Sequence, residues 1–168
     1  MQTSANGRKL IESFEGLFLQ AYDDANDRIV QRGDIVRGTL TIGYGHTSAA
    51  GPPAVYVGMS ITEPVADTIL AADLASVEIE VAHLVTVPLN QNQFDALVSF
   101  QFNTGWLAHP QCSLRRQLNA GNYNVAAQDF MLYDEAQGKV LAGLERRREA
   151  ERELFLQPVT PAAVEESA

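Results

Sequence analysis

One long helical segment in the middle of the chain constrains the fold more than any other feature of this sequence. Thr62-Glu63-Pro64 combines an N-cap residue, an acidic first turn and an early proline, which together are typical of a helix start. Apolar residues then recur at helical spacing to about residue 85, before Pro88 ends the pattern. Such a helix is about 30 Å long. Because β-type runs precede it and helical patterns follow it, this helix suits the role of a strut that connects a β-containing segment to a helical remainder.

The first predicted helix spans residues 4–15 and ends at a glutamate. Ser4 suits the N-cap position, Ile11 and Phe14 lie on one apolar face, and Gly16 is a residue that commonly stops helices. Glu15 falls on the edge of that face. A glutamate in this place is more often a solvated side chain, but its charge opposes the helix macrodipole. Glu15 is therefore a candidate functional residue.

Short β structure is predicted between residues 28 and 44. Ile29-Val30 and Ile35-Val36 flank the turn-like tetrapeptide 31–34, which indicates a hairpin. A further strand is expected at residues 40–42. Gly43 and Gly45 then bracket Tyr44, a pattern that favours close backbone packing or positive φ.

The rest of the chain is predicted to be helical. We expect one domain over residues 1–157, divided into a β-containing lobe (1–60), the connecting helix (61–86) and a helical lobe (87–157). Helices are predicted at 90–102, 112–118, 124–133 and 144–156, with a loop between Gly138 and Gly143. Residues 158–168 are small, acidic and Pro-containing, so we expect a disordered tail.

The charge balance excludes some kinds of partner. The 168 residues include 12 Lys and Arg against 21 Asp and Glu, a formal charge of −9. Because phosphate binding needs a basic face, nucleic acid is not an expected partner. The first residues contain no apolar run and no stretch is long enough to cross a bilayer, so neither a signal peptide nor a membrane anchor is expected.

Two carboxylates suggest a class of chemistry. Glu15 and Asp24 lie nine residues apart, one at a helix end and one in the acidic stretch that follows. Carboxyl groups that face each other across a cleft suit glycoside hydrolysis, in which one protonates the leaving oxygen and the other handles water or oxocarbenium charge. The apolar neighbours Ile11 and Phe14 suit the acid, and the polar loop around Asp24 suits the second carboxylate. The spacing alone is common among proteins.

Other reactive groups give weaker signals. His46, His83 and His109 are far apart and lack zinc-site spacing, so we expect neither a metal nor another cofactor. Cys112 is the only cysteine, which excludes an intrachain disulfide and fits a reducing compartment. The arginine run 146–148 is most often a solvated helix face, although in so acidic a chain it can also pair with carboxylates or contact an anionic substrate.

Several motifs together resemble the phage lysozyme family, glycoside hydrolase family 24. They cover about residues 7 to 157, in the family's order. In the first half they are Phe14-Glu15-Gly16, Ala21-Tyr22-Asp23-Asp24 and Thr41-Ile42-Gly43-Tyr44-Gly45-His46-Thr47. In the second half they are Gln93 to Phe100, Phe102-Asn103-Thr104-Gly105, Ser113-Leu114, Leu118-Asn119-Ala120-Gly121, Gly138-Lys139 and Gly143 to Arg148.

The resemblance implies a muramidase with three catalytic residues. Glu15 would be the general acid, and Asp24 and Thr41 would hold or activate the attacking water of an inverting hydrolase. The bond cleaved would be the β-1,4 link between N-acetylmuramic acid and N-acetylglucosamine in peptidoglycan, so the protein would be an endolysin that lyses the host cell.

The resemblance also implies supporting residues and a fold. Phe100 and Ser113 match positions that line the far side of the cleft. His46 and Asp73 match a pair that ties the first lobe to the long helix. The implied fold is the lysozyme-like α+β fold, which has a small N-terminal lobe with a short sheet, a long connecting helix and a helical C-terminal lobe.

The same resemblance implies where such an enzyme works. It would stay in the host cytoplasm until a holin-type membrane protein releases it, and it would then act on glycan strands of the cell wall in the periplasm. We expect a monomer, because an enzyme that cleaves a polymer needs an open groove.

Three departures from the family pattern and three competing functions remain open. Residues 25–40 separate Asp24 from Thr41, where compact members have only a handful of residues. Tyr133 stands where many members have tryptophan, and the chain is acidic where many such lysozymes are basic. The first competing function is that of a lytic transglycosylase, which needs one acid and no water-holding pair. The second is that of a non-catalytic wall-binding protein, and the third is that of an unrelated helical interaction protein.

Overall fold

In the computed structural model, which describes residues 1–136 and 139–159, the chain starts with a short capped helix. Helix α1 spans Ala5–Phe14, and the Ser4 side chain accepts hydrogen bonds from the backbone N–H groups of Asn6 and Gly7. This confirms the predicted N-cap. The helix ends because Glu15 takes up an extended conformation, with φ −92° and ψ 133°. The chain therefore turns away from the helix axis at Glu15.

A small antiparallel sheet follows, in the order β2-β1-β3-β4. Its strands are β1 (Phe18–Asp23), β2 (Arg28–Ile29), β3 (Leu40–Gly43) and β4 (His46–Thr47). The predicted hairpin is partly wrong. Ile29 pairs with Tyr22 of β1, and residues 35–36 form no strand. The turn itself exists, because the Asp34 N–H donates to the Gln31 carbonyl oxygen at 2.9 Å.

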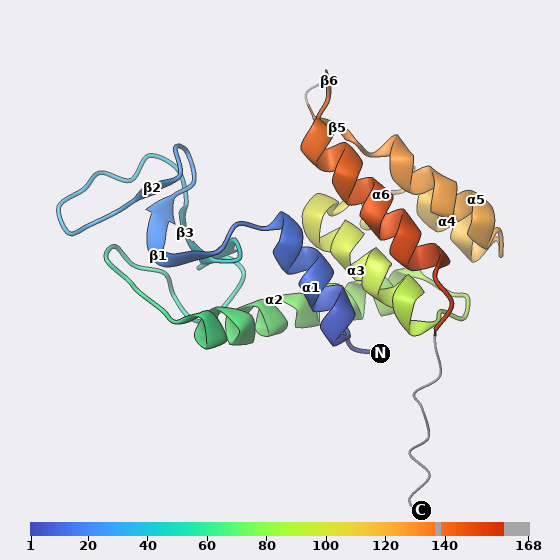
Figure 1. Cartoon of the computed structure of the whole chain (residues 1–168), viewed down its shortest axis with the longest axis horizontal. Helices are drawn as coiled ribbons and strands as arrows, with labels where there is room; N and C mark the ends of the chain where they lie inside the picture. Colours follow the sequence, from blue (N-terminus) through green and yellow to red (C-terminus); the bar gives the residue numbers. More distant parts are fainter. Residues whose placement is uncertain (137–138, 160–168) are drawn as a thin grey trace, which may run out of the picture.

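The connecting helix is present as predicted and is two residues shorter at each end than the predicted range 61–86. Helix α2 spans Glu63–Leu84, and Thr62 occupies the N-cap position without a side-chain capping bond. Its 22 residues correspond to about 33 Å. Figure 1 shows α2 running from the sheet to the helices of the second half.

The helices of the second half pack around α3, which spans Gln91–Thr104. Asn90 and Gln93 form a capping box at its start, and every residue from Phe94 to Gln101 is buried. Around it lie α4 (Ser113–Asn119), α5 (Tyr123–Asp129) and α6 (Ala142–Leu156).

Several local predictions in this half were wrong. Helix α5 ends at Asp129 and continues as a 3-10 turn, η2 (Phe130–Leu132), so it is shorter than predicted. Gly143 lies inside α6 rather than in a loop. A second 3-10 turn, η1 (Trp106–Ala108), and a small hairpin, β5 (Glu135–Ala136) with β6 (Lys139–Val140), were not predicted. Gly138 and, apart from residues 158–159, the predicted tail lie outside the described residues.

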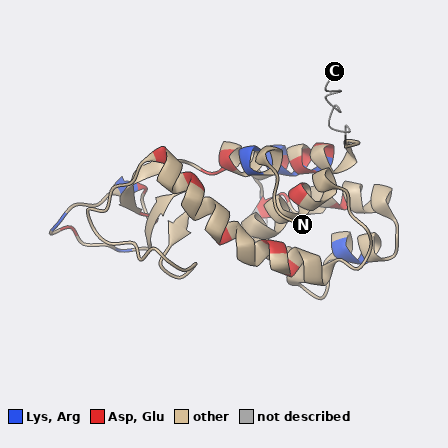
Figure 2. Cartoon of the chain, turned by 90° about the horizontal axis from the view of Figure 1, so that it is seen from below, with Lys and Arg blue, Asp and Glu red and all other residues tan. Residues whose placement is uncertain are grey.

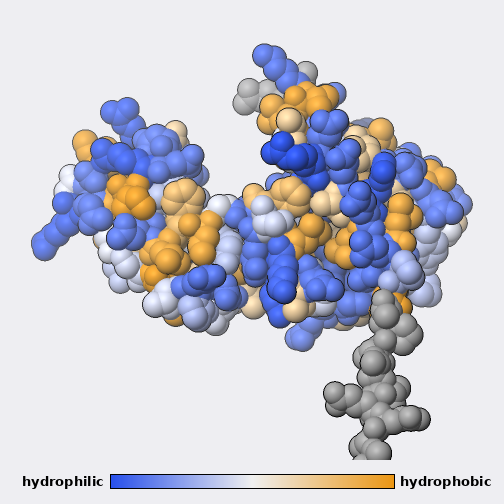
Figure 3. Space-filling model, in the orientation of Figure 1, coloured by the Kyte–Doolittle hydropathy of each residue, from blue (hydrophilic) through white to orange (hydrophobic). Residues whose placement is uncertain are grey.

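Two hydrophobic cores of unequal size result. The larger lies between α2, α3 and the surrounding helices and includes residues such as Leu74, Leu97 and Phe130. The smaller lies under the sheet and consists of Ala21, Val30, Ile42 and Met59. Ile61 packs against both cores. Figure 3 shows a notch in the surface between the part with the sheet and the part with the helices.

Candidate active site

Glu15 lies on the wall of a groove beside the helical part. The groove measures about 500 Å³, and the Glu15 side chain is 23% exposed. An adjoining groove of about 470 Å³ is lined by Tyr133 and Trp106, and the two grooves share Asn103 and Leu144. A partly exposed carboxyl group over such a surface is accessible to an extended ligand.

Arg147 of α6 fixes the Glu15 side chain. Its Nη1 lies 2.6 Å from Glu15 Oε1, and its Nε lies 3.2 Å from Glu151 Oε1. The guanidinium also faces the Phe14 ring at 5.6 Å. Arg147 is only 3% exposed, so this planar fork is held between two carboxylates in a dry setting.

Arg147 is therefore a site residue that was not selected from the sequence. The prevailing interpretation of the arginine run 146–148 was a solvated helix face, whereas Arg147 and Arg148 are both buried. The available signal was three consecutive arginines in an acidic chain, which suggested pairing with carboxylates without naming a partner. Glu15 and Arg147 are 132 positions apart, so only the fold identifies the pair.

Asp24 follows directly after β1 and is exposed. Its Oδ1 accepts a hydrogen bond from the backbone N–H of Thr39, at the far end of the long β1–β3 connection. Gly38 is required beside this contact, because a Cβ on Gly38 would overlap Asp24 Oδ1. One carboxylate oxygen of Asp24 is thus positioned by the loop, and the side chain remains accessible.

The neighbouring carboxylate, Asp23, has a different role. It is 1% exposed and accepts backbone N–H bonds from Ala25 at 3.1 Å, Gly38 at 2.8 Å and Arg37 at 2.8 Å. The N–H group of Arg37 is the largest of the influences that lower the pKa of Asp23. Asp23 therefore closes the base of the connection as a carboxylate.

Tyr22 is influenced by both candidate carboxylates. Thr41 on β3 is its register partner. Burial raises the pKa of the Tyr22 phenol, and the charges of Asp27, Asp24 and Glu15 raise it further. Both candidate carboxylates thus act on one phenol, whose register partner in the sheet is the third candidate, Thr41.

Thr41 is less accessible than its proposed role suggests. It is 4% exposed, and its hydroxyl donates to the Thr39 carbonyl oxygen at 3.1 Å. The long insertion before it leaves it on β3, paired with both Tyr22 and Thr47. Its oxygen retains acceptor capacity toward a water molecule.

The role of Phe100 and Ser113 at the far side of the cleft stays a prediction, and the two residues differ in exposure, since Ser113 is partly exposed. Phe100 is 0% exposed and packs edge-on against Phe130 and Tyr133, with ring centroids 5.4 and 5.1 Å away. Because it faces the core, it supports the groove from behind. The Ser113 hydroxyl donates to Asp129, and its N–H donates to the Tyr133 hydroxyl at 3.0 Å.

Tyr133 itself is part of the groove surface. Burial raises the pKa of its phenol to about 12. The hydroxyl that accepts from Ser113 also lies 3.6 Å from the Cys112 sulfur. The tyrosine that replaces tryptophan here thus contributes both packing and a fixed hydroxyl.

His46 and Asp73 join the sheet to α2. His46 Nδ1 lies 2.9 Å from Asp73 Oδ2, and Nε2 lies 2.9 Å from the Pro53 carbonyl oxygen. The His46 side chain is buried, with 1% exposed, and the Asp73 side chain is 9% exposed. Burial raises the pKa of Asp73, while the contact with His46 acts in the opposite direction.

Within residues 1–136 and 139–159, no three His, Cys, Asp or Glu side chains converge as metal ligands do. Over the same ranges, no helix combines the length and the apolar character needed to cross a bilayer.

Comparisons with known proteins agree on one family. The phage lysozyme family model matches residues 12–151. The endolysin of Salmonella phage P22 is 43% identical over 156 residues, covering 93% of this chain and 99% of that protein. A crystal structure of a P22 lysozyme mutant has a TM-score of 0.79 at 40% identity, covering 94% of this chain and 99% of the other. The muramidase domain of SpmX from Asticaccaulis excentricus has a TM-score of 0.76 at 42% identity, with the same coverage. This chain, with its α+β lysozyme-like fold, belongs to the phage lysozyme family.

Proposed function

We propose that this chain is an endolysin that hydrolyses the β-1,4 bond between N-acetylmuramic acid and N-acetylglucosamine in peptidoglycan. The observation that carries the proposal is that Glu15 lines a groove and contacts Arg147, while its charge and that of Asp24 act on the same Tyr22 phenol. A relative of 43% identity is an endolysin, and a structure of 42% identity is a muramidase domain.

In this proposal Glu15 is the general acid. Its side chain lines the groove and contacts Arg147, and as the acid it supplies a proton to the leaving oxygen. Sugar rings that fill the groove exclude water from the surroundings of Glu15, and Arg147 keeps its second contact, with Glu151. Arg147 then stays in place to pair with the carboxylate that forms once the proton is transferred.

Asp24 and Thr41 position and activate the attacking water. Asp24 has one oxygen bound to the Thr39 N–H, which leaves its other oxygen to accept a proton from water. The Thr41 hydroxyl oxygen accepts a hydrogen bond from the same water molecule. Attack from the face opposite Glu15 inverts the anomeric carbon, so the first product carries the α-configuration. Proton NMR of the products within the first minutes of turnover tests this stereochemistry.

The first experiment compares wild type with Glu15→Gln on purified peptidoglycan, with mass analysis of the released sugars. Glu12→Gln, one turn earlier on α1, is the matched control. A general acid contributes about 10²–10⁴ in rate, so Glu15→Gln should be almost inactive and Glu12→Gln active. Reducing muramic acid ends support the hydrolase. Anhydro ends would identify a transglycosylase instead, and wall binding without release by wild type would identify a non-catalytic protein.

We also propose how the enzyme reaches its substrate. It accumulates in the host cytoplasm as a monomer and depends on a separate holin-type membrane protein for access to the glycan strands in the periplasm. Cytoplasmic expression alone should leave cells intact, and co-expression of a membrane-permeabilising protein should lyse them. Lysis on expression alone would contradict the dependence, and a dimer in sedimentation would contradict the monomer.

A further inference from the structure

The connection between β1 and β3 forms an open ring with a fixed base. It begins beside Asp24 and returns at Thr39, where the Asp23 and Asp24 carboxylates hold the backbone N–H groups of both arms. Arg28 and Asp34 close the upper part through an ion pair at 2.8 Å. Figure 1 shows the ring projecting from the β2 side of the sheet.

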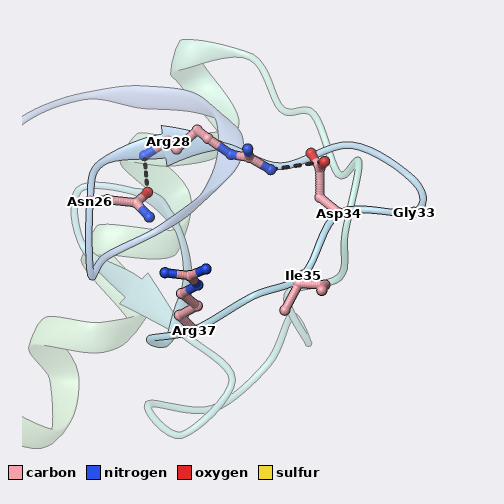
Figure 4. A pocket seen from close by; sticks show the side chains of 6 residues that line it. All are labelled: Asn26, Arg28, Gly33, Asp34, Ile35 and Arg37. Atoms are coloured by element: carbon pink, nitrogen blue, oxygen red, sulfur yellow. Dashed lines mark hydrogen bonds and ion pairs between the residues drawn. The ribbon is translucent and has the colours of Figure 1, made fainter.

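This ring surrounds a cavity of about 520 Å³, lined by Asn26, Arg28, Gly33, Asp34, Ile35 and Arg37. In Figure 4 the guanidinium of Arg37 points into the ring, toward Asn26 and the strand that carries Arg28. Arg28 already has Asp34 as its partner. In the described part of the chain, the Arg37 guanidinium has no hydrogen bond or ion pair, although its backbone N–H is held by Asp23.

The cavity has the opposite charge to the protein as a whole. The chain carries −9, whereas the ionisable groups that line the cavity are two arginines and one aspartate, a sum of +1. Figure 2 shows basic positions on this ring, in a part of the chain distant from those on α6. A guanidinium that faces a cavity beside an amide group is suited to a carboxylate, which accepts two parallel N–H bonds.

The chemistry of peptidoglycan indicates which anionic group could bind in this cavity. The sugar backbone of peptidoglycan is uncharged, and its carboxylates are on the short peptides that branch from the muramic acid units. A peptide of three to five residues reaches about 10–17 Å from the glycan. The ring starts at the residue after Asp24, so a peptide branching from a glycan beside Asp24 can extend along it.

We propose that this cavity is a subsite for a carboxylate of the peptidoglycan stem peptide, with Arg37 as its principal ligand and Arg28 and Asn26 as further donors. The inference rests on the proposed function, because it takes peptidoglycan as the substrate. The subsite makes the enzyme prefer peptide-bearing glycan over bare glycan.

Steady-state kinetics on two substrates test the subsite. One is peptidoglycan free of teichoic acid, and the other is the same glycan after an amidase has removed its peptides. Arg37→Gln should raise KM about fivefold on the peptide-bearing glycan and leave KM on bare glycan and kcat on both unchanged. Its backbone bond to Asp23 is retained, and thermal unfolding checks that the variant folds.

Arg32→Gln is the matched control, because it removes the same charge from the same ring at an exposed position that does not line the cavity. It should behave like wild type on both glycans. Equal effects of the two substitutions would overturn the subsite, since only the general charge of the ring would then matter. An equal rise in KM for Arg37→Gln on bare glycan would also overturn the subsite.

A binding measurement separates this proposal from the activity itself. The free tripeptide L-alanyl-D-glutamyl-diaminopimelate, titrated into wild type and Arg37→Gln, should bind the wild type at least fivefold more tightly by NMR shift changes. If wild type cleaves neither glycan but binds the tripeptide through Arg37, the proposed activity fails and the subsite stands. Cleavage without any difference in tripeptide binding leaves the activity standing and rejects the subsite.

Discussion

Asp23 and Asp24 are neighbours with different environments. Asp23 is buried among backbone N–H donors, whereas Asp24 is exposed at the end of the strand. Successive side chains of a strand point to opposite faces, which explains how adjacent carboxylates reach such different places. One therefore shapes the loop and the other is available for chemistry.

Asp23→Asn should destabilise the loop and lower kcat, because an amide presents one acceptor oxygen and sets its own NH₂ group against N–H donors. Since the folded-state pKa of Asp23 is lowered, its stabilising effect is complete above the unfolded value near 4 and is lost as pH falls through the folded value. Urea unfolding should show a difference between variant and wild type at pH 7 that shrinks by pH 2–3. Asp27→Asn is the control, since its φ of 54° suits asparagine. A difference that is independent of pH would contradict this role.

Arg147 makes contacts that a lysine cannot reproduce. Its Nη1 binds Glu15 and its Nε binds Glu151, and a single ammonium cannot reach both carboxylates with this geometry. We expect Arg147→Lys to lower kcat about tenfold or more and to lower the midpoint of thermal unfolding. Arg152→Lys, on the same helix with only a 3.5 Å contact to Gln128, should change neither. Unchanged kcat for Arg147→Lys would show that charge alone is sufficient.

At the scale of elements, helix starts were predictable and strand partners were not. Ser4 and Asn90 mark helix starts through side-chain bonds to residues two or three positions away, so the local sequence contains the whole signal. A strand needs a partner strand. In the structure β1 pairs with Ile29 of β2 and with β3, which leaves no partner for Ile35-Val36, and the local sequence does not show this. Ile35 is 81% exposed, whereas Val36 packs against the smaller core, so this apolar pair contributes to the core without forming a strand.

The residues of the candidate site likewise include some that the local sequence predicts and others that only the fold brings together. Glu15, Asp24 and Thr41 lie in one stretch of chain, and short motifs are enough to group them. Arg147 is brought to Glu15 only by the packing of α6 against α1 and α3. For Phe100, the resemblance indicated a position near the cleft but not that its ring faces the core.

Two glycines in helices should respond oppositely to the same substitution. A Cβ on Gly7 of α1 would lie 2.6 Å from Asp95 Cγ, so Gly7→Ala should push α1 away from α3 and destabilise the protein by about 1–3 kcal/mol. Gly143 in the first turn of α6 has open space around it, so Gly143→Ala should stabilise by about 0.5 kcal/mol. Chemical denaturation measures both changes. Equal signs would show that helix propensity outweighs packing at Gly7.

At the scale of the whole molecule, the two cores give the two parts unequal stability. The core under the sheet has four buried residues, whereas the helical core extends from α2 to α6. Local opening has its lowest free energy where few apolar contacts are broken. The sheet, which carries Asp24 and Thr41, should therefore open without unfolding the helices, and the His46–Asp73 pair and Ile61 limit this opening.

Native-state hydrogen exchange tests this division of the molecule. Amides of β1 and β3 should exchange through a partial opening that leaves α3 protected. Asp73→Ala leaves the buried His46 Nδ1 without its partner, so it should speed exchange in the sheet at least tenfold and change α3 little. Asp67→Ala is the control, an exposed acid on the same helix that accepts only from the Tyr44 hydroxyl at 3.2 Å. If sheet and α3 amides instead exchange with the same free energy, the molecule opens as one unit. The groove beside Glu15 would then be as rigid as the core, and glycan strands would have to enter it without any movement of the sheet.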